Sequence, residues 1–155
     1  MNQQKFDFLT QQFVPLLKDL QANAMGKWGK MNAQQMAEHV AAFFYVSAGK
    51  IKFDLVTAFE HLPKYKEFLL SDKEFRENTK APSSVLGEEP LPLRHANMAQ
   101  AIDGLQNSID AFVGHFAADV NKTTCHPVFG ELNFEEWVLL HYKHVTHHLK
   151  QFNLL

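Results

Sequence analysis

One capping pattern begins three separate amphipathic stretches of this chain, and it constrains the fold more than any other feature. An asparagine is followed three residues later by glutamine or glutamate at Asn32–Gln35, Asn97–Gln100 and Asn133–Glu136. The asparagine side chain can accept a hydrogen bond from the first helical turn, and the third residue can reach back to it. Three long helices with the same start, and no alternating strand pattern, predict an all-α fold.

The last of these stretches, residues 133–152, holds four of the nine histidines within eight residues. Apolar residues recur there at three- and four-residue steps, which is typical of a helix with one buried face. That predicted buried face consists of Phe134, Trp137, Leu140, Val145, Leu149 and Phe152. The opposite, exposed face is predicted to carry Glu135, Glu136, Lys143 and Lys150.

His144 and His148 lie one helical turn apart, about 40° from each other around the axis. Two imidazoles in this arrangement can share a metal ion, although a surface patch or hydrogen-bonded core histidines would show the same spacing. The apolar neighbours argue against a solvated patch. A metal site needs a third ligand, and His39 is a candidate because it lies on the apolar face predicted for the second helix. A single buried histidine is more often hydrogen-bonded to a carbonyl.

The first half of the chain gives two further predicted helices. Residues 3–22 are predicted to form a helix with one apolar stripe. Pro15 either kinks this helix or begins a second one. Residues 24–30 are predicted to form a loop. The helix that starts at Asn32 should end before Gly49, with a buried face of Met36, His39, Phe43 and Val46.

The middle of the chain shows weaker patterns. Pro63 could open a short helix through residues 68–70, which residues 73–76 would extend. Residues 80–92 contain three prolines and a glycine and predict an irregular connection, a candidate lid between the second and third long helices. Residues 119–133 are predicted to form a loop.

Composition limits the function classes. A chain of 155 residues is most simply one domain, residues 1–155, and a net charge of −2 argues against a nucleic-acid partner. Cys125 is the single cysteine, so no internal disulfide is possible and the cytoplasm is expected. Cys125 has no motif typical of a nucleophile. The sequence shows no apolar signal core, and its longest apolar run, Val40–Val46, is too short to cross a membrane.

Two segments resemble the signatures of a known family when they are taken together. They are residues 28–39 (WGKMNAQQMAEH) and residues 126–152, which contain HPVFG, Trp137 and HVTHHLKQF. They are similar to a family of unknown function within the DinB/YfiT-like superfamily of metalloenzymes. The resemblance implies an up-down-down-up four-helix bundle with a long crossover between helices 2 and 3. It also implies zinc or nickel held by His39, His144 and His148, with His147 outside the ligand set.

Three histidines leave a coordination position open, as in catalytic zinc sites. We therefore expect a metal-dependent enzyme acting on a small molecule, by hydrolysis or by transfer of a low-molecular-weight thiol, which the resemblance also suggests. The alternative is a non-catalytic helical module that dimerises and keeps a structural or vestigial metal. A homodimer is expected from the resemblance. No carboxylate is placed as a general base, because Glu38 lies about 100° from His39 on its helix.

Four further residues are candidates for the pocket around the metal. Gln151 could orient a ligand imidazole, or be a solvated residue near a helix end. His126 could be an acid/base group, although Pro127 suggests a turn-making role. His141 is interpreted as a buried structural histidine in preference to a fourth ligand, and Trp28 as a core or wall residue.

Overall fold

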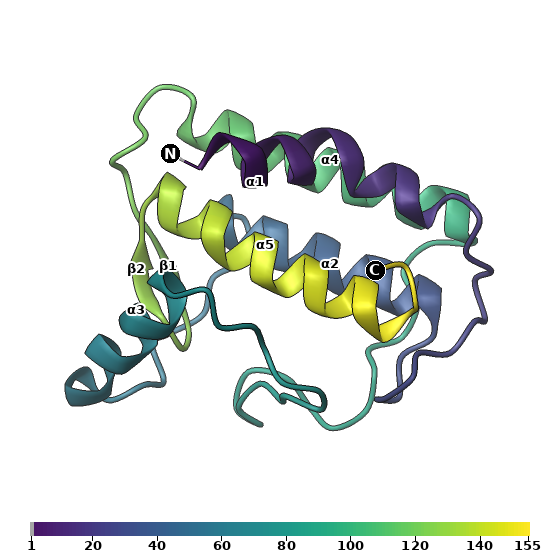
Figure 1. Cartoon of the computed structure of the whole chain (residues 1–155), viewed down its shortest axis with the longest axis horizontal. Helices are drawn as coiled ribbons and strands as arrows, with labels where there is room; N and C mark the ends of the chain where they lie inside the picture. The colour runs from purple at the N-terminus through teal and green to yellow at the C-terminus, as the bar shows by residue number, and fades with distance from the viewer. Residues whose placement is uncertain (1) are drawn as a thin grey trace.

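The structure is a computed structural model that describes residues 2–155, and it is mostly helical (Figure 1). Its three long helices are α2 (Ala33–Ser47), α4 (Met98–Phe116) and α5 (Phe134–Gln151). The predicted caps are confirmed, since the preceding asparagine accepts a hydrogen bond from the third following residue in each helix. The reciprocal bond forms at α2 and α5, whereas Gln100 of α4 accepts from the Ala96 N–H.

The N-terminal stretch is wound from three short helical pieces. They are α1 (Gln3–Asp7), the π-helical η1 (Phe8–Gln12) and the 3₁₀-helical η2 (Val14–Leu17). Pro15 lies in the first turn of η2, where its missing N–H costs no helical hydrogen bond. Of the two alternatives, a leading helix followed by a new turn is therefore the one observed. The last helical piece, η2, ends at Leu17, so the predicted helix does not extend to residue 22.

A small hairpin makes the all-α prediction wrong at one place. The predicted loop 119–133 contains β1 (Thr124–His126) and β2 (Gly130–Leu132), which pair antiparallel with Thr124 opposite Leu132. Gly130 at the turn has a φ of 78°, a value that favours glycine. Strands of three residues are too short to show an alternating pattern. In Figure 1 the hairpin stands at one end of the long helices, near α3.

The middle of the chain forms a short helical unit and then a long irregular stretch. η3 (Phe59–His61) leads into α3 (Leu62–Leu70), so the predicted helix near Pro63 is confirmed. α3 ends at Leu70, and residues 73–76 do not extend it. Residues 71–97, called the crossover segment below, contain no helix or strand and pass beneath α2 and α5 in Figure 1. This confirms the irregular connection.

One hydrophobic core joins the N-terminal pieces to α2, α4 and α5. All six apolar residues predicted for the buried face of α5 are buried. The largest side chains that are less than 2% exposed include Trp137, Phe13, Phe44, Phe112, Phe116, Leu9 and Leu17. No helix formed by residues 2–155 combines the length and apolar character needed to cross a membrane.

Two predicted faces are corrected by the packing. The buried face of α2 centres on Met36, Val40 and Phe44, each 0% exposed, while His39 and Phe43 are only half-buried. Lys143 on α5 was expected at the surface, but it is 5% exposed. Both differences arise on the side of α2 and α5 that faces the crossover segment. A cavity on this side leaves His39 and Phe43 partly exposed, and the crossover segment covers Lys143.

Candidate metal centre

The three histidines selected from the sequence converge in space. His39 lies on α2, while His144 and His148 lie one turn apart on α5. His39 Nε2 is 3.0 Å from His144 Nε2, and His148 Nε2 is 3.1 Å from that same His144 atom. One ring nitrogen of each residue lies within 4.8 Å of the other two, so the group could bind a metal ion.

Gln151, one turn further along α5, fixes the orientation of His148. The Gln151 amide nitrogen donates to the Trp28 carbonyl at 2.7 Å, which leaves the amide oxygen 2.8 Å from His148 Nδ1. An amide oxygen only accepts hydrogen bonds, so His148 carries its proton on Nδ1. Its Nε2 lone pair therefore faces His144. Gln151 is 3% exposed, which excludes the solvated alternative.

The loop around Trp28 closes tightly on Gln151. A Cβ atom at Gly26 would lie 2.7 Å from Gln151 Cγ, and one at Gly29 would lie 2.8 Å from Gln151 Nε2. Gly29 also has a φ of 79°. The Lys27 N–H donates to the Gln151 carbonyl at 2.7 Å. Glycine is thus required at both positions for the Trp28 carbonyl to reach the amide that orients His148.

The spacing of the three rings fits a shared cation better than it fits hydrogen bonds. His148 has its proton on Nδ1, and His144 has one proton for two neighbouring Nε2 atoms. Two nitrogens bound at about 2.05 Å to one tetrahedral zinc ion lie about 3.3 Å apart, close to the spacing of these Nε2 atoms. A cation that takes the Nε2 lone pair of each ring would remove the need for a proton between these atoms, with the His144 proton then on its buried Nδ1, which has no hydrogen-bond partner among the described residues.

Burial keeps the three imidazoles neutral near pH 7. It lowers the pKa of His39 to about 4, with a smaller contribution from repulsion by His147. The pKa values of His144 and His148 are lowered well below the ordinary value, first by burial and then by the neighbouring histidines. Only a neutral imidazole offers a lone pair to a metal. Protons therefore compete little for these nitrogens near neutrality.

The trio borders a cavity of about 1480 Å³ that lies between the α2–α5 pair and the crossover segment. His39 and His144 are half-buried because one side of each ring faces this space, whereas His148 is 5% exposed. A molecule in the cavity would therefore meet the first two rings directly.

Glu38 attaches one end of the crossover segment to α2. Glu38 is 8% exposed and, like His39, borders the large cavity, and its carboxylate accepts from the Arg94 N–H at 2.7 Å and the His95 N–H at 3.1 Å. Burial alone would raise the pKa of Glu38, but the two N–H donors, a hydrogen bond from the Gln34 side chain and attraction to His95 together outweigh it and lower the pKa. Glu38 therefore remains ionised as an anchor and is not placed as a general base.

Lys143 attaches the other end to α5. Its Nζ donates to the carbonyl oxygens of Ser71 at 2.6 Å and Lys73 at 2.5 Å, just beyond the C-terminus of α3. Burial lowers the pKa of Lys143, and the two carbonyls replace the lost water. Each anchor directly precedes a histidine of the trio, Glu38 before His39 and Lys143 before His144.

His126 stabilises the turn of the β1–β2 hairpin. Its Nδ1 atom accepts from the N–H groups of Val128 at 2.9 Å and Phe129 at 3.1 Å, which closes the turn between β1 and β2. Burial lowers the pKa of His126 to about 3, so the ring is neutral under all ordinary conditions. Of its two predicted roles, turn-making is the one observed. Its ring still borders the large cavity.

His141 belongs to the core, as interpreted from the sequence, and does not join the trio. Its Nε2 atom lies 2.8 Å from Ser47 Oγ, and that hydroxyl donates to the Phe44 carbonyl at 2.7 Å. The ring stacks on Phe44 with centroids 3.8 Å apart. Since the hydroxyl proton is used, His141 donates through Nε2. Its Nδ1 atom is then a buried acceptor without a partner.

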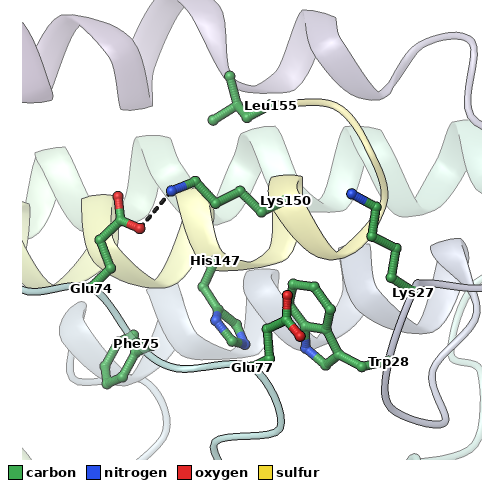
Figure 2. Close-up of a pocket in the computed structure, with 8 residues that line it drawn as sticks. All are labelled: Lys27, Trp28, Glu74, Phe75, Glu77, His147, Lys150 and Leu155. Atoms are coloured by element: carbon green, nitrogen blue, oxygen red, sulfur yellow. Dashed lines mark hydrogen bonds and ion pairs between the residues drawn. The ribbon is translucent and has the colours of Figure 1, made fainter.

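His147 lies outside the trio and lines a second, smaller cavity of about 340 Å³ (Figure 2). Its ring centroid is 5.5 Å from that of Trp28 and 6.1 Å from that of Phe75. Lys150 and Glu74, which form an ion pair at 2.5 Å, both line this cavity (Figure 2). Trp28 is thus half-buried in a cavity wall and not in the core.

Fold and site together define a mostly helical protein with a three-histidine group that could hold a metal. Comparison with known families matches residues 5–154 to the family described as "Protein of unknown function (DUF1569)". The match spans nearly the whole chain, so the chain belongs to this family. No curated protein and no solved structure matches it.

Proposed function

We propose that this protein is a divalent-metal-dependent enzyme whose zinc or nickel ion is held by His39, His144 and His148. The observation that supports it is the convergence of three neutral Nε2 atoms at the wall of a large cavity. Three protein ligands leave a coordination position open, which is the arrangement of catalytic zinc sites. Imidazole suits both metals.

Two reactions on a small organic molecule fit this site: hydrolysis, and transfer of a low-molecular-weight thiol. A divalent cation supplies acidity, because it lowers the pKa of a water molecule or thiol that occupies its open position. The chain's own residues hold the three rings neutral and fix His148 through Gln151. The crossover segment forms the far side of the cavity that the site borders.

The proposed class is the DinB/YfiT-like superfamily, with an up-down-down-up four-helix bundle. In this assignment the N-terminal pieces form the first helix, followed by α2, α4 and α5. Three features support it: α2 packs along α4, α1 and η1 pack on α5, and a long connection separates α2 from α4. The homodimer expected from the resemblance belongs to the same proposal, and sedimentation analysis would test it.

Metal analysis of protein purified without a metal-affinity column tests the site. We expect about one zinc or nickel ion per chain, and loss of that metal in His39→Ala. The matched control is His115→Ala, which changes a half-buried histidine on α4 that is outside the trio. Equal metal content in wild-type protein and His39→Ala would contradict the assignment.

Turnover assays then distinguish enzyme from module. The metal-loaded protein is offered activated esters, and separately an electrophile with a low-molecular-weight thiol. Turnover that is lost in His144→Ala supports the enzyme. Strong thermal stabilisation by the metal without turnover of either substrate type would assign the protein to the alternative, a helical module with a structural metal.

A further inference from the structure

The cavity beside the trio is larger than a small ester or thiol requires. Ligand pockets commonly enclose about 300–1,000 Å³, whereas this one has a volume of about 1480 Å³. Its size therefore calls for a bulkier occupant, and its walls show what kind of molecule that is.

Apolar side chains form two facing walls. One wall consists of residues outside the crossover segment that pack on the core and also border the cavity: Phe43, Ile51, Phe53, Phe68 and Val128. The crossover segment supplies Val85, Leu86 and Leu91 to the other wall. Leu91 is 57% exposed, so water covers apolar surface that a ligand would remove from it.

The acidic side chains that border the cavity already interact with other groups. Glu38 accepts hydrogen bonds from backbone N–H groups, and Glu74 pairs with Lys150. Glu89 pairs with Lys30, which Glu88 also attracts.

The basic side chains around the cavity are different. Within residues 2–155, five that border it have no ion pair or side-chain hydrogen bond, namely Lys64, Lys73, Arg76, Lys80 and Arg94. All five are exposed, and four belong to the crossover segment. They therefore form a basic rim around the cavity whose five cations make no ion pair with the described part of the chain.

We infer that the substrate of this site is an organic anion with an extended apolar body, which carries its reacting group, an ester bond or an electrophilic carbon, at the end away from the charge. The apolar body lies between the two walls, the anionic end meets the basic rim, and the other end reaches the histidines. This inference rests on the proposed function, because it takes the cavity to be the substrate pocket of the metal centre.

Displacement of the fluorescent anion anilinonaphthalene sulfonate from the cavity measures the affinity for ligands of different chain length and charge. Decanoate should bind about 15-fold more tightly than octanoate, since each buried CH₂ contributes about fourfold. Decyltrimethylammonium, which has the same chain and the opposite charge, should bind at least about tenfold more weakly than decanoate, and added salt should reduce that difference. Equal affinity for octanoate and decanoate, or for the anion and the cation, would overturn the inference.

Paired variants locate the binding. Leu91→Asn should weaken decanoate binding about tenfold, whereas Leu93→Asn, at a 47% exposed leucine that does not border the cavity, should leave it unchanged. Combining Arg76→Gln with Lys80→Gln should weaken decanoate and spare decyltrimethylammonium. Lys18→Gln is the control for that pair. Equal effects of Leu91→Asn and Leu93→Asn would place the ligand elsewhere.

The same titration in His39→Ala separates the two proposals. One outcome is that the wild-type protein carries no metal and His39→Ala keeps the chain-length and charge preferences. The ligand preference of the cavity would then stand, and the proposed metal-dependent function would not. If the wild-type protein binds metal and is active but shows neither preference, the proposed function would stand and this inference would fall.

Discussion

The α2–α5 pair and the crossover segment face each other across the cavity, yet they are built in opposite ways. α5 has reciprocal capping bonds and a fully buried apolar face. The crossover segment has no regular structure and is mostly exposed. It is held at its ends by Glu38 and Lys143, and along its length by the Lys30–Glu89 and Lys150–Glu74 ion pairs.

This contrast corresponds to two different requirements of a ligand-binding metal site: precise placement of the metal ligands and an adaptable wall for the organic molecule. Imidazole nitrogens must be placed within a few tenths of an ångström to share a cation, and the close-packed helices α2 and α5 provide that precision. Recognition of a flexible apolar molecule needs a wall that can adapt, and a segment with few buried contacts opens locally at low free-energy cost.

The largest expected effect is on global stability. Phe44→Ala in α2 should lower the free energy of unfolding by about 3–5 kcal/mol, because it removes a fully buried ring and leaves a void beside His141. Leu93→Ala in the crossover segment should change it by less than about 0.5 kcal/mol. Urea denaturation measures both. Similar losses from the two substitutions would erase the contrast between the regions.

A smaller effect is expected when the support of a ligand is removed. Gln151→Leu keeps the volume and deletes the acceptor that holds His148 Nδ1–H, so metal affinity should fall about 10–100-fold. Competition with a chromophoric chelator gives the affinity. Gln106→Leu removes a comparable helical glutamine, one that donates to Asp110 on α4, and should have no effect. Unchanged affinity in Gln151→Leu would show that the helix alone orients the ring.

The smallest effect concerns the hairpin and pH. The unfolded chain protonates His126 below pH 6.5, whereas the folded ring is protonated only near pH 3. The unfolded state thus binds more protons in this window, and stability falls as pH falls. His126→Asn keeps an acceptor for the turn and should reduce that slope by up to about 1.4 kcal/mol per pH unit. Denaturation between pH 7 and pH 5 with a chelator present measures it, and equal slopes would contradict it.

The sequence predicted those parts of the molecule that local chemistry determines. Asn32 and Asn133 cap their helices through residues three positions away, so the signal lies within one turn. The rotational phase of α5 placed His144 and His148 on one face. Glu38 and Lys143 escaped prediction as anchors, since their partners are main-chain groups of a segment that has no periodicity. The hairpin escaped because each strand has only three residues.

The attachment of the crossover segment has a consequence for ligand exchange. Glu38 and Lys143 fix its two ends to the backbone positions immediately before His39 and His144. Opening of the residues between these ends therefore requires the exposed Lys30–Glu89 ion pair to separate, while both ends stay in place. Any rotation of either helix on filling the trio would shift an end of that span. In the proposed enzyme, metal occupancy and the rate of substrate entry should thus be linked, because both act on the same span.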